Sequence, residues 1–325
     1  MKVLIAGGTG FLGRHVTEAL RAVGHTIVLV ARGTPSVGES DGVEVVRGDV
    51  AAGPLPPEAL RGADAVVNLI GIKREQGTQT FERVHVGATG HLIEAARSGG
   101  ARRFIQISVV RCRPDPSSPY HDTKWRAEGL VRGCGLPWTI LRPGVIYGPG
   151  DDMVTHLVKM IRFAPIFPVV GRGDSLLQPV HAGDLAAAVA GALTNDRSVG
   201  ETYDVVGPER LSLRAVVETV ARGVGLPLRI VGTPLWFQRA AVEAMNAAFR
   251  NPLSTTAQLR MLIDGLYGDP EPARRDLSVE PRTFTSDEVR ILAGAILPLF
   301  GVSLRRSGGA GTDASTAAPV EGGRS

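Results

Sequence analysis

Three glycines placed three residues apart, Gly7, Gly10 and Gly13, lie close to the first residue of the chain. They follow the apolar run Val3–Ala6 and lead into a helical pattern of apolar residues, a context that favours a ligand-binding turn over a plain one. Such a turn points the amide-rich N-terminus of a helix at a ligand, most often a pyrophosphate. Gly7 would permit the tight turn, Gly10 would leave room for the ligand, and Gly13 would let helix and strand pack closely. We therefore predict a dinucleotide site with contacts from Gly7, Thr9, Gly10, Phe11, Leu12 and Gly13.

A second pair of residues that could do chemistry is Tyr120 and Lys124. At i and i+4 they would share one face of a helix, and Pro119 just before them is a helix-start signal. A nearby ammonium lowers the pKa of a phenol, so Tyr120 could exchange a proton with a substrate hydroxyl or carbonyl. Lys124 could also hydrogen-bond a ribose. Tyr–Lys pairs are common on exposed helix faces, and this one gains weight because it follows the fifth strand-like run of a dinucleotide-binding pattern.

The residues after the second strand-like run indicate which dinucleotide is bound. NAD-binding sites usually place an Asp or Glu about twenty residues past the glycines, where it contacts the ribose. Here Ala31 and Arg32 occupy this place. An arginine can pair bidentately with a 2′-phosphate, and Arg14 could assist it. NADP(H) is therefore the predicted cofactor, with NAD(H) as the alternative if Arg32 is only a solvated loop residue.

Other strand ends should border the same cleft. Asp49 suits the exocyclic amine of an adenine, although Asp after a strand is also a common turn former. Gly71 would keep the floor of the cleft open, and the rigid turn Leu141–Pro149 would border the nicotinamide. The cofactor contacts predicted at these strand ends are Asp49, Val50, Asn68, Gly71, Pro143 and Val145, together with Lys124.

Strand-like and helical patterns alternate through the first half of the chain. The apolar runs are residues 3–6, 26–31, 43–47, 65–70, 103–108 and 138–141, and the helical patterns are 12–23, 57–61, 81–98 and 120–133. Continuous apolar strands linked by helices predict an α/β protein, a doubly wound parallel sheet of the Rossmann type. The ligand should lie at the carboxyl ends of its strands.

Beyond about residue 150 the pattern loosens. We expect helices at 153–163, 185–193, 213–224, 235–250 and 255–266, and strands at 176–180, 202–206 and 228–231. The predicted organisation is a dinucleotide-binding core over 1–150, and a mixed segment over 151–304 that partly returns to the sheet and forms a smaller C-terminal lobe. Residues 305–325 lack large apolar residues in any periodic pattern and should be a disordered tail.

Composition limits the class of function. The chain has 325 residues, 43% of them hydrophobic, and a net charge of +4 without a dense basic block, which argues against nucleic acid as a partner. Cys112 and Cys134 are expected to be free thiols in a reducing compartment, and no metal site is predicted. We expect a cytoplasmic location, with the cytoplasmic membrane face as an alternative. The apolar run Ile291–Leu304 is too short to span a bilayer and should be a helix of the C-terminal lobe, with membrane or partner docking as the alternative role.

Three segments resemble a known family when taken in order. The sequences GGTGFLG, YHDTK and LRPGVIYGPG occur in the order seen in extended and atypical short-chain dehydrogenases/reductases, over roughly residues 1–210. The segments VVNLIGI, FERVHV and LQPVHAGD are similar to bacterial relatives of the accessory NADPH-binding subunit of respiratory complex I. The resemblance implies a Rossmann fold, a bound dinucleotide, and Tyr120 and Lys124 as the proton-transfer pair.

Two positions depart from the pattern of catalytically competent relatives. Where these have a Ser or Thr just past the fifth strand, the count falls on Val110, which cannot donate a hydrogen bond, and Ser108 is a substitute two residues early. Ser117 or Ser118 could also supply a hydroxyl. Where many relatives have an asparagine in the preceding helix, His85 stands. Both departures put dehydrogenase turnover in question.

Two functions therefore stay open. The first is an NADP(H)-dependent oxidoreductase or epimerase that acts on an unidentified small-molecule substrate through Tyr120 and Lys124. The second is a non-catalytic dinucleotide-binding structural or sensor protein, peripherally associated with a membrane complex. A nucleic-acid regulator on the same fold is disfavoured because the sequence lacks a basic patch.

Overall fold

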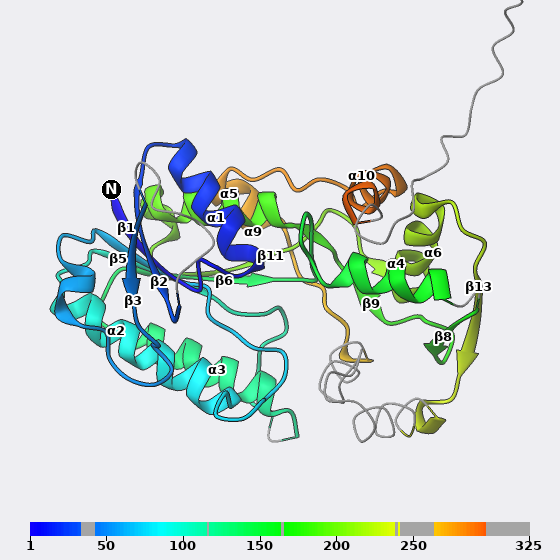
Figure 1. Cartoon of the computed structure of the whole chain (residues 1–325), viewed down its shortest axis with the longest axis horizontal. Coiled ribbons are helices and arrows are strands. Elements are labelled where there is room, and N and C mark those ends of the chain that lie inside the picture. The colour runs from blue at the N-terminus through cyan, green and yellow to red at the C-terminus, as the bar shows by residue number, and fades with distance from the viewer. Residues whose placement is uncertain (34–42, 116, 164–165, 238–239, 241–262, 297–325) are drawn as a thin grey trace, which may run out of the picture.

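A seven-stranded parallel sheet forms the centre of the computed structural model, which describes residues 1–33, 43–115, 117–163, 166–237, 240 and 263–296 (Figure 1). The strand order is β11-β6-β5-β4-β1-β2-β3, and each neighbouring pair runs parallel. The predicted doubly wound Rossmann-type sheet is thus confirmed. The strands are β1 (Lys2–Ala6), β2 (Thr26–Ala31), β3 (Val43–Arg47), β4 (Ala65–Asn68), β5 (Arg103–Ile107), β6 (Trp138–Pro143) and β11 (Glu201–Val205).

Some strands end at other residues than predicted, and at β4 a local hydrogen bond explains the difference. This strand ends at Asn68 and not at Ile70, because the side chain Oδ1 of Asn68 accepts the backbone N–H of Ile70 at 3.0 Å. That bond turns the chain out of the ladder. β6 extends two residues beyond the predicted run, to Pro143, where it pairs with Val205 of β11.

Helices cover both faces of the sheet (Figure 1). One face carries α1 (Phe11–Ala22), α5 (Ala182–Thr194) and α9 (Glu271–Leu277), which pack on one another and on the sheet in a single apolar cluster. The other carries α2 (Ala88–Ser98) and α3 (Pro119–Arg132). The helix predicted over 81–98 is a π-helix at Glu82–Gly87 followed by α2, and the one over 57–61 is a short 3-10 helix, Pro57–Leu60.

A smaller lobe lies beside the sheet, on the right of Figure 1. Its helices α4 (Met153–Phe163), α6 (Leu213–Val224) and α10 (Ser286–Ile296) pack together around a second apolar core. The predicted helices 153–163 and 213–224 are confirmed. Three small strand pairs complete the lobe and join it to the sheet: β7 (Ile146–Tyr147) with β10 (Val180–His181), β9 (Leu176–Leu177) with β12 (Leu211–Ser212), and β8 (Ile166–Val170) with β13 (Arg229–Thr233).

The strand predicted over 176–180 is divided into β9 and β10 by Gln178. Its backbone N–H donates to the carbonyl of Leu266, so the chain exchanges one pairing partner for another at this residue. Strand β8 was not predicted. Of the predicted helices 235–250 and 255–266, most residues lie outside the described part, as does the predicted tail 305–325.

The C-terminal apolar run is helical as far as the structure describes it. Helix α10 begins at Ser286, before the predicted run, and packs on α4 and α6 of the lobe, while residues 297–304 lie outside the described part. Among the described residues, none of the helices has the length and apolar character needed to cross a membrane. Cys112 and Cys134 are both buried and free, as predicted.

Candidate active site

The glycine turn between β1 and α1 has the tight packing that its spacing predicts. Gly7 has φ +86°, a left-handed conformation that favours glycine. A Cβ at Gly13 would lie 2.3 Å from the carbonyl oxygen of Gly7 and 2.5 Å from Cα of Gly8, so only glycine lets the helix approach the turn. A Cβ at Gly10 would meet just the Gly7 oxygen, at 3.3 Å, and would otherwise face open space.

The N-terminus of α1 is left open by this turn. Gly10 is the N-cap residue and offers no side-chain cap, and the first helical turn carries no acidic residue. The free amides of this turn, which includes Phe11, Leu12 and Gly13, and the positive end of the helix dipole therefore suit an anion. This geometry fits a dinucleotide pyrophosphate.

Arg32 lies at the carboxyl end of β2 in the position expected for selection of the ribose. Its side chain is exposed and makes no ion pair with an acidic residue in the described ranges. Arg14 is directed elsewhere, because a Cβ at Gly150 would meet its Nη2 at 2.8 Å. Arg14 therefore lies over the turn after β7. This position does not support the prediction that Arg14 assists Arg32 in binding a 2′-phosphate.

The two cofactor contacts predicted after β3, Asp49 and Val50, have different surroundings. Asp49 forms a turn, as the alternative interpretation predicted, with Oδ1 accepting from the amide of Ala51 at 3.0 Å. Its second oxygen has no hydrogen-bond partner in the described ranges. Val50 is buried in the apolar cluster under α2. A side-chain contact between Val50 and a cofactor would require it to leave that cluster.

Asn68 has an internal role that the sequence did not indicate. Its Nδ2 donates to Thr89 Oγ1 at 3.1 Å and to Gln106 Oε1 at 2.9 Å, and its Oδ1 accepts from Ile70. The side chain is 1% exposed. Asn68 therefore shapes the turn after β4, and a direct side-chain contact with a cofactor, as predicted, does not follow from this geometry.

Tyr120 and Lys124 lie on one face of α3, as their spacing predicts, and both are buried. The Lys124 ammonium donates to the carbonyl of Ile107 at the end of β5, at 3.3 Å, and to that of Ile70 just past β4, at 3.5 Å. Gly71 makes room for it, since a Cβ there would lie 3.2 Å from Lys124 Nζ. The lysine is therefore placed at the carboxyl edge of the sheet, where a dinucleotide ribose would lie.

The electrostatics of this pair differ from the expectation. Burial raises the pKa of Tyr120 above its usual value, and Lys124 does not offset this effect. Burial also lowers the pKa of Lys124, to about 8, against smaller raising effects from Cys112 and Glu128. The expected lowering of the phenol pKa by the ammonium is thus wrong for this structure. The Tyr120 ring is instead enclosed by aromatic edges from Phe81, His85 and His121.

His85 is a neutral, fixed residue behind this pair. Its Nε2 accepts the backbone N–H of Ile72 at 3.3 Å, so the proton is assigned to Nδ1, which lies 2.9 Å from Thr123 Oγ1. Burial, helped by the charge of Lys124, lowers its pKa to about 2. His85 therefore braces α3 and the turn after β4, and it does not take up a proton at neutral pH.

The hydroxyls proposed near Tyr120 have other neighbours. Val110 is buried, and its backbone N–H donates to the carbonyl of Pro143. Ser108 Oγ is buried beside the Cys112 thiol and the Glu128 carboxylate, and it has no hydrogen-bond partner among the described residues. Its catalytic role stays a prediction. Ser117 Oγ donates to Asp115 and Ser118 Oγ pairs with His121 Nδ1, so both loop hydroxyls are already engaged.

Sequence reasoning missed Glu128, one helical turn beyond Lys124. Its carboxylate is fully buried and accepts two hydrogen bonds from Arg142, at 2.8 and 2.6 Å, and one from Arg132 at 2.6 Å. These bonds hold its pKa below the usual range despite burial. The same i, i+4 spacing that indicated the Tyr–Lys pair would have found it. Glu128 ties α3 to β6, and hence to the buried Pro143 and half-buried Val145 of the predicted nicotinamide turn.

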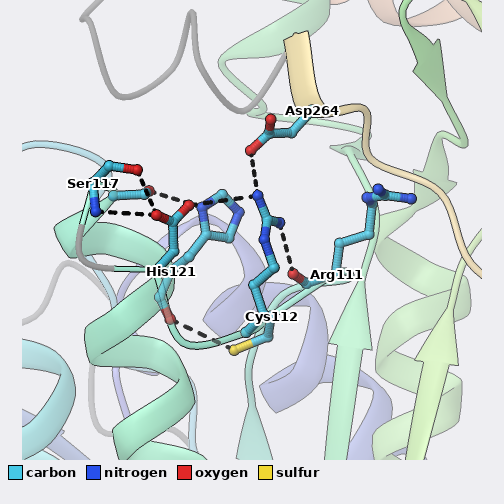
Figure 2. Close-up of polar contacts among 8 residues, drawn as sticks. Arg111, Cys112, Ser117, His121 and Asp264 are labelled. Carbon is cyan, nitrogen blue, oxygen red and sulfur yellow. Dashed lines mark hydrogen bonds and ion pairs between the residues drawn. The ribbon is translucent and has the colours of Figure 1, made fainter.

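An ion-pair network lies over the loop between β5 and α3 (Figure 2). Asp115, His121 and Asp264 have ligand atoms within 4.8 Å of one another, a grouping that could hold a metal ion. Arg113 Nη2, however, already lies 2.8 Å from Asp264 and 3.5 Å from Asp115, so both carboxylates have a cationic partner. The network joins the loop before α3 to the segment that follows residue 262.

Comparisons with known proteins agree with this geometry. The profile of the NAD dependent epimerase/dehydratase family matches residues 3–206. One relative is a 40 kDa subunit of mitochondrial NADH-ubiquinone oxidoreductase from Neurospora crassa, which is 27% identical over 85% of this chain and 75% of its own length. Another is a (4-alkanoyl-5-oxo-2,5-dihydrofuran-3-yl)methyl phosphate reductase from Streptomyces griseus, which is 28% identical over 86% of this chain and 97% of its own length. A ceramide reductase from Caulobacter vibrioides is 33% identical over 57% of this chain and 58% of its own length.

Solved structures show the same fold. A structure of MoeE5 in complex with UDP-glucose and NAD has a TM-score of 0.72 and 21% identity, covering 93% of this chain and 100% of that one. A UDP-glucuronic acid 4-epimerase from Bacillus cereus, in complex with UDP-glucuronic acid and NAD, has a TM-score of 0.72 and 20% identity, covering 92% and 100%. At these identities the likeness concerns the fold.

Proposed function

Because this chain belongs to the NAD dependent epimerase/dehydratase family and is an NAD(P)-binding short-chain dehydrogenase/reductase-type protein, we propose that it is an NADPH-dependent reductase of a carbonyl substrate at the cytoplasmic side. The observation that carries the proposal is the buried Tyr120–Lys124 pair at the carboxyl edge of β4 and β5, on the same edge of the sheet as the uncapped N-terminus of α1. Relatives that act as reductases, one on a phosphate ester and one on a ceramide, support it.

The residues that would hold the cofactor are those at the strand ends. The α1 amides would bind the pyrophosphate, Arg32 the 2′-phosphate, and Lys124 the ribose beside the nicotinamide. When bound, NADPH would supply the hydride. The choice of NADPH over NADH rests on Arg32, whose guanidinium has no acidic partner among the described residues.

Tyr120 would supply the proton. Its raised pKa keeps the phenol protonated at neutral pH, which suits a group that delivers a proton to a carbonyl oxygen as that oxygen becomes an alkoxide. A low phenol pKa would instead have suited a base that takes the proton of an alcohol while an oxidised nicotinamide takes its hydride. Lys124 would then help to return a proton to Tyr120, since with a pKa of about 8 its ammonium gives up a proton more readily than an exposed lysine does.

The test compares the protein with its Tyr120→Phe variant on a panel of aldehydes, ketones and nucleotide sugars with NADPH. The variant should retain cofactor affinity and lose about 10²-fold or more in turnover, since general acid catalysis contributes on that order. Equal turnover by both proteins would remove Tyr120 from the reaction.

A second candidate is a non-catalytic protein that binds the dinucleotide structurally and docks on a membrane complex. The observations that favour it are Val110, buried where relatives carry a hydroxyl, and His85, neutral and fixed where many carry an asparagine. The relative from a mitochondrial NADH-ubiquinone oxidoreductase supports it. Purified protein whose bound dinucleotide is neither oxidised nor reduced by any substrate, and which pellets with a membrane complex, would favour it. Steady turnover of one substrate would exclude it.

A further inference from the structure

Two arginines from distant parts of the chain lie against one tyrosine ring. The Cζ atom of Arg111 is 4.6 Å from the centroid of the Tyr267 ring, and that of Arg210 is 4.9 Å from it. Arg111 follows β5, and Arg210 immediately precedes β12. Both guanidinium groups therefore lie over the ring of Tyr267.

The part of the chain that the structure describes offers no acidic partner to these two positive charges. Among the described residues, neither Arg111 nor Arg210 is within ion-pair distance of a carboxylate. Arg113 is the contrast, since Asp115 and Asp264 both contact it, and in Figure 2 the Arg111 side chain extends away from that network. A guanidinium stacked on an aromatic face keeps its in-plane N–H donors available, which is the geometry that carboxylates and phosphates accept.

The backbone holds this arrangement in place. The residue before the tyrosine, Leu266, exchanges backbone hydrogen bonds with Leu176 and Gln178, and the amide after it, Gly268, donates to Gln178 Oε1. Arg210 Nη2 donates to the carbonyl of Gly268 at 3.1 Å. Arg111 has φ +59°, a left-handed conformation that is uncommon outside glycine and concentrates at functional sites.

The loop that carries Arg111 contacts the helix that carries Tyr120. Cys112 follows Arg111 directly. Its Sγ donates, at 3.8 Å, to the carbonyl of His121, which is the residue after Tyr120. The loop that presents Arg111 is thus tied to the first turn of α3. A substrate that contacts both Tyr120 and the arginines would extend from the start of α3 toward the lobe.

We propose that Arg111 and Arg210, stacked on Tyr267, bind a phosphate monoester group of the substrate. This inference rests on the proposed reductase function in one respect, because it takes the bound phosphate monoester to be the substrate of that reductase. Two fixed positive charges match a phosphate monoester, which carries about −1.5 to −2 charges at neutral pH, better than they match a carboxylate with one. The substrate class is therefore a phosphorylated carbonyl compound.

The test is isothermal titration of the full chain, with and without saturating NADPH, using phenyl phosphate and benzoate as probes that differ only in the anionic group. The wild type should bind phenyl phosphate about tenfold more tightly than benzoate. Arg111→Gln and Arg210→Gln should each weaken phenyl phosphate binding by about tenfold or more, because a hydrogen bond to a charged group contributes on that order. Arg229→Gln, at an exposed position of β13, is the matched control and should bind like the wild type.

Thermal melts and NADPH titrations accompany these measurements, and both should be unchanged in the two variants. Phenyl phosphate affinity that survives both substitutions, benzoate binding as tight as phenyl phosphate, or no phosphate binding by the wild type would each overturn the proposal. Arginine-dependent phosphate binding without any NADPH oxidation would instead preserve the subsite and count against the reductase function.

Discussion

The sharpest structural prediction concerns Gly13→Ala in the turn between β1 and α1. The new methyl group would lie 2.3 Å from the Gly7 oxygen and 2.5 Å from two backbone atoms of Gly8. These are backbone atoms of a tight turn, so they cannot rotate away as a side chain could. Overpacking of this kind costs about 3 kcal/mol at the upper end of its range, and the better helix propensity of alanine returns about 1 kcal/mol. We therefore expect a net loss of about 2 kcal/mol in the free energy of unfolding.

Two other glycines supply controls for that substitution. Gly129 of α3 has nothing within 4 Å of its added Cβ, so Gly129→Ala should stabilise the protein, by about 0.5 kcal/mol. Gly10→Ala meets only the Gly7 oxygen at 3.3 Å, so it should change stability little and weaken dinucleotide binding instead, because the methyl group enters the ligand's approach.

Urea denaturation followed by circular dichroism measures all three variants, and fluorescence titration with NADPH measures binding. The reasoning requires the order Gly13→Ala below wild type below Gly129→Ala in stability, with Gly10→Ala close to wild type. If Gly13→Ala is as stable as the wild type, close packing of helix on turn is not the reason for a glycine at position 13.

Two further predictions concern charge. Arg32→Ala should weaken NADPH binding by at least tenfold and NADH binding hardly at all, because a bidentate arginine–phosphate pair is lost; isothermal titration with both cofactors checks this, and equal losses would refute the 2′-phosphate assignment. Burial lowers the pKa of Lys124 from its usual 10.5 to about 8, so the unfolded chain holds more protons than the folded chain between these two pH values. The free energy of unfolding should therefore rise with pH across this range, by on the order of 3 kcal/mol. Burial raises the pKa of Cys112 to about 12, which contributes an opposite change in both proteins above about pH 9. Urea melts at pH 7.5 and pH 10 should therefore show a more positive change in the wild type than in Lys124→Met, and equal changes in both would contradict the assignment.

The features that could be predicted from the sequence are local ones. The β1–turn–α1 unit follows from a short apolar run and three glycines, and Gly13 packs on Gly7 and Gly8 of the same turn. The Tyr120–Lys124 pair follows from helical spacing. In each case the spacing of nearby residues is enough to predict the local element.

The features that could not be predicted depend on contacts between distant segments. Asn68 looks like a cleft residue in sequence, but Thr89 and Gln106 take its amide group. The phenol pKa of Tyr120 is set by the depth of its burial among Phe81, His85 and His121, which the i+4 spacing of Lys124 does not reveal.

The lobe shows the same limit at the level of whole elements. Strand β8 (Ile166–Val170) pairs with β13 (Arg229–Thr233), which lies far along the chain, and the sequence of neither strand indicates the other. Arg111, Arg210 and Tyr267 likewise come from three distant segments that share no motif, so the sequence does not indicate that they meet.

The most direct measurement of the central claim is the fate of the transferred hydrogen. The full chain is incubated with NADPH deuterated at C4 and a panel of carbonyl compounds that includes phosphorylated aldehydes and ketones, and the products are examined by mass spectrometry. A reductase of the proposed kind incorporates one deuterium at the former carbonyl carbon of at least one panel member, and the label is lost in Tyr120→Phe. Tight NADPH binding with no labelled product from any carbonyl compound would contradict the proposed activity.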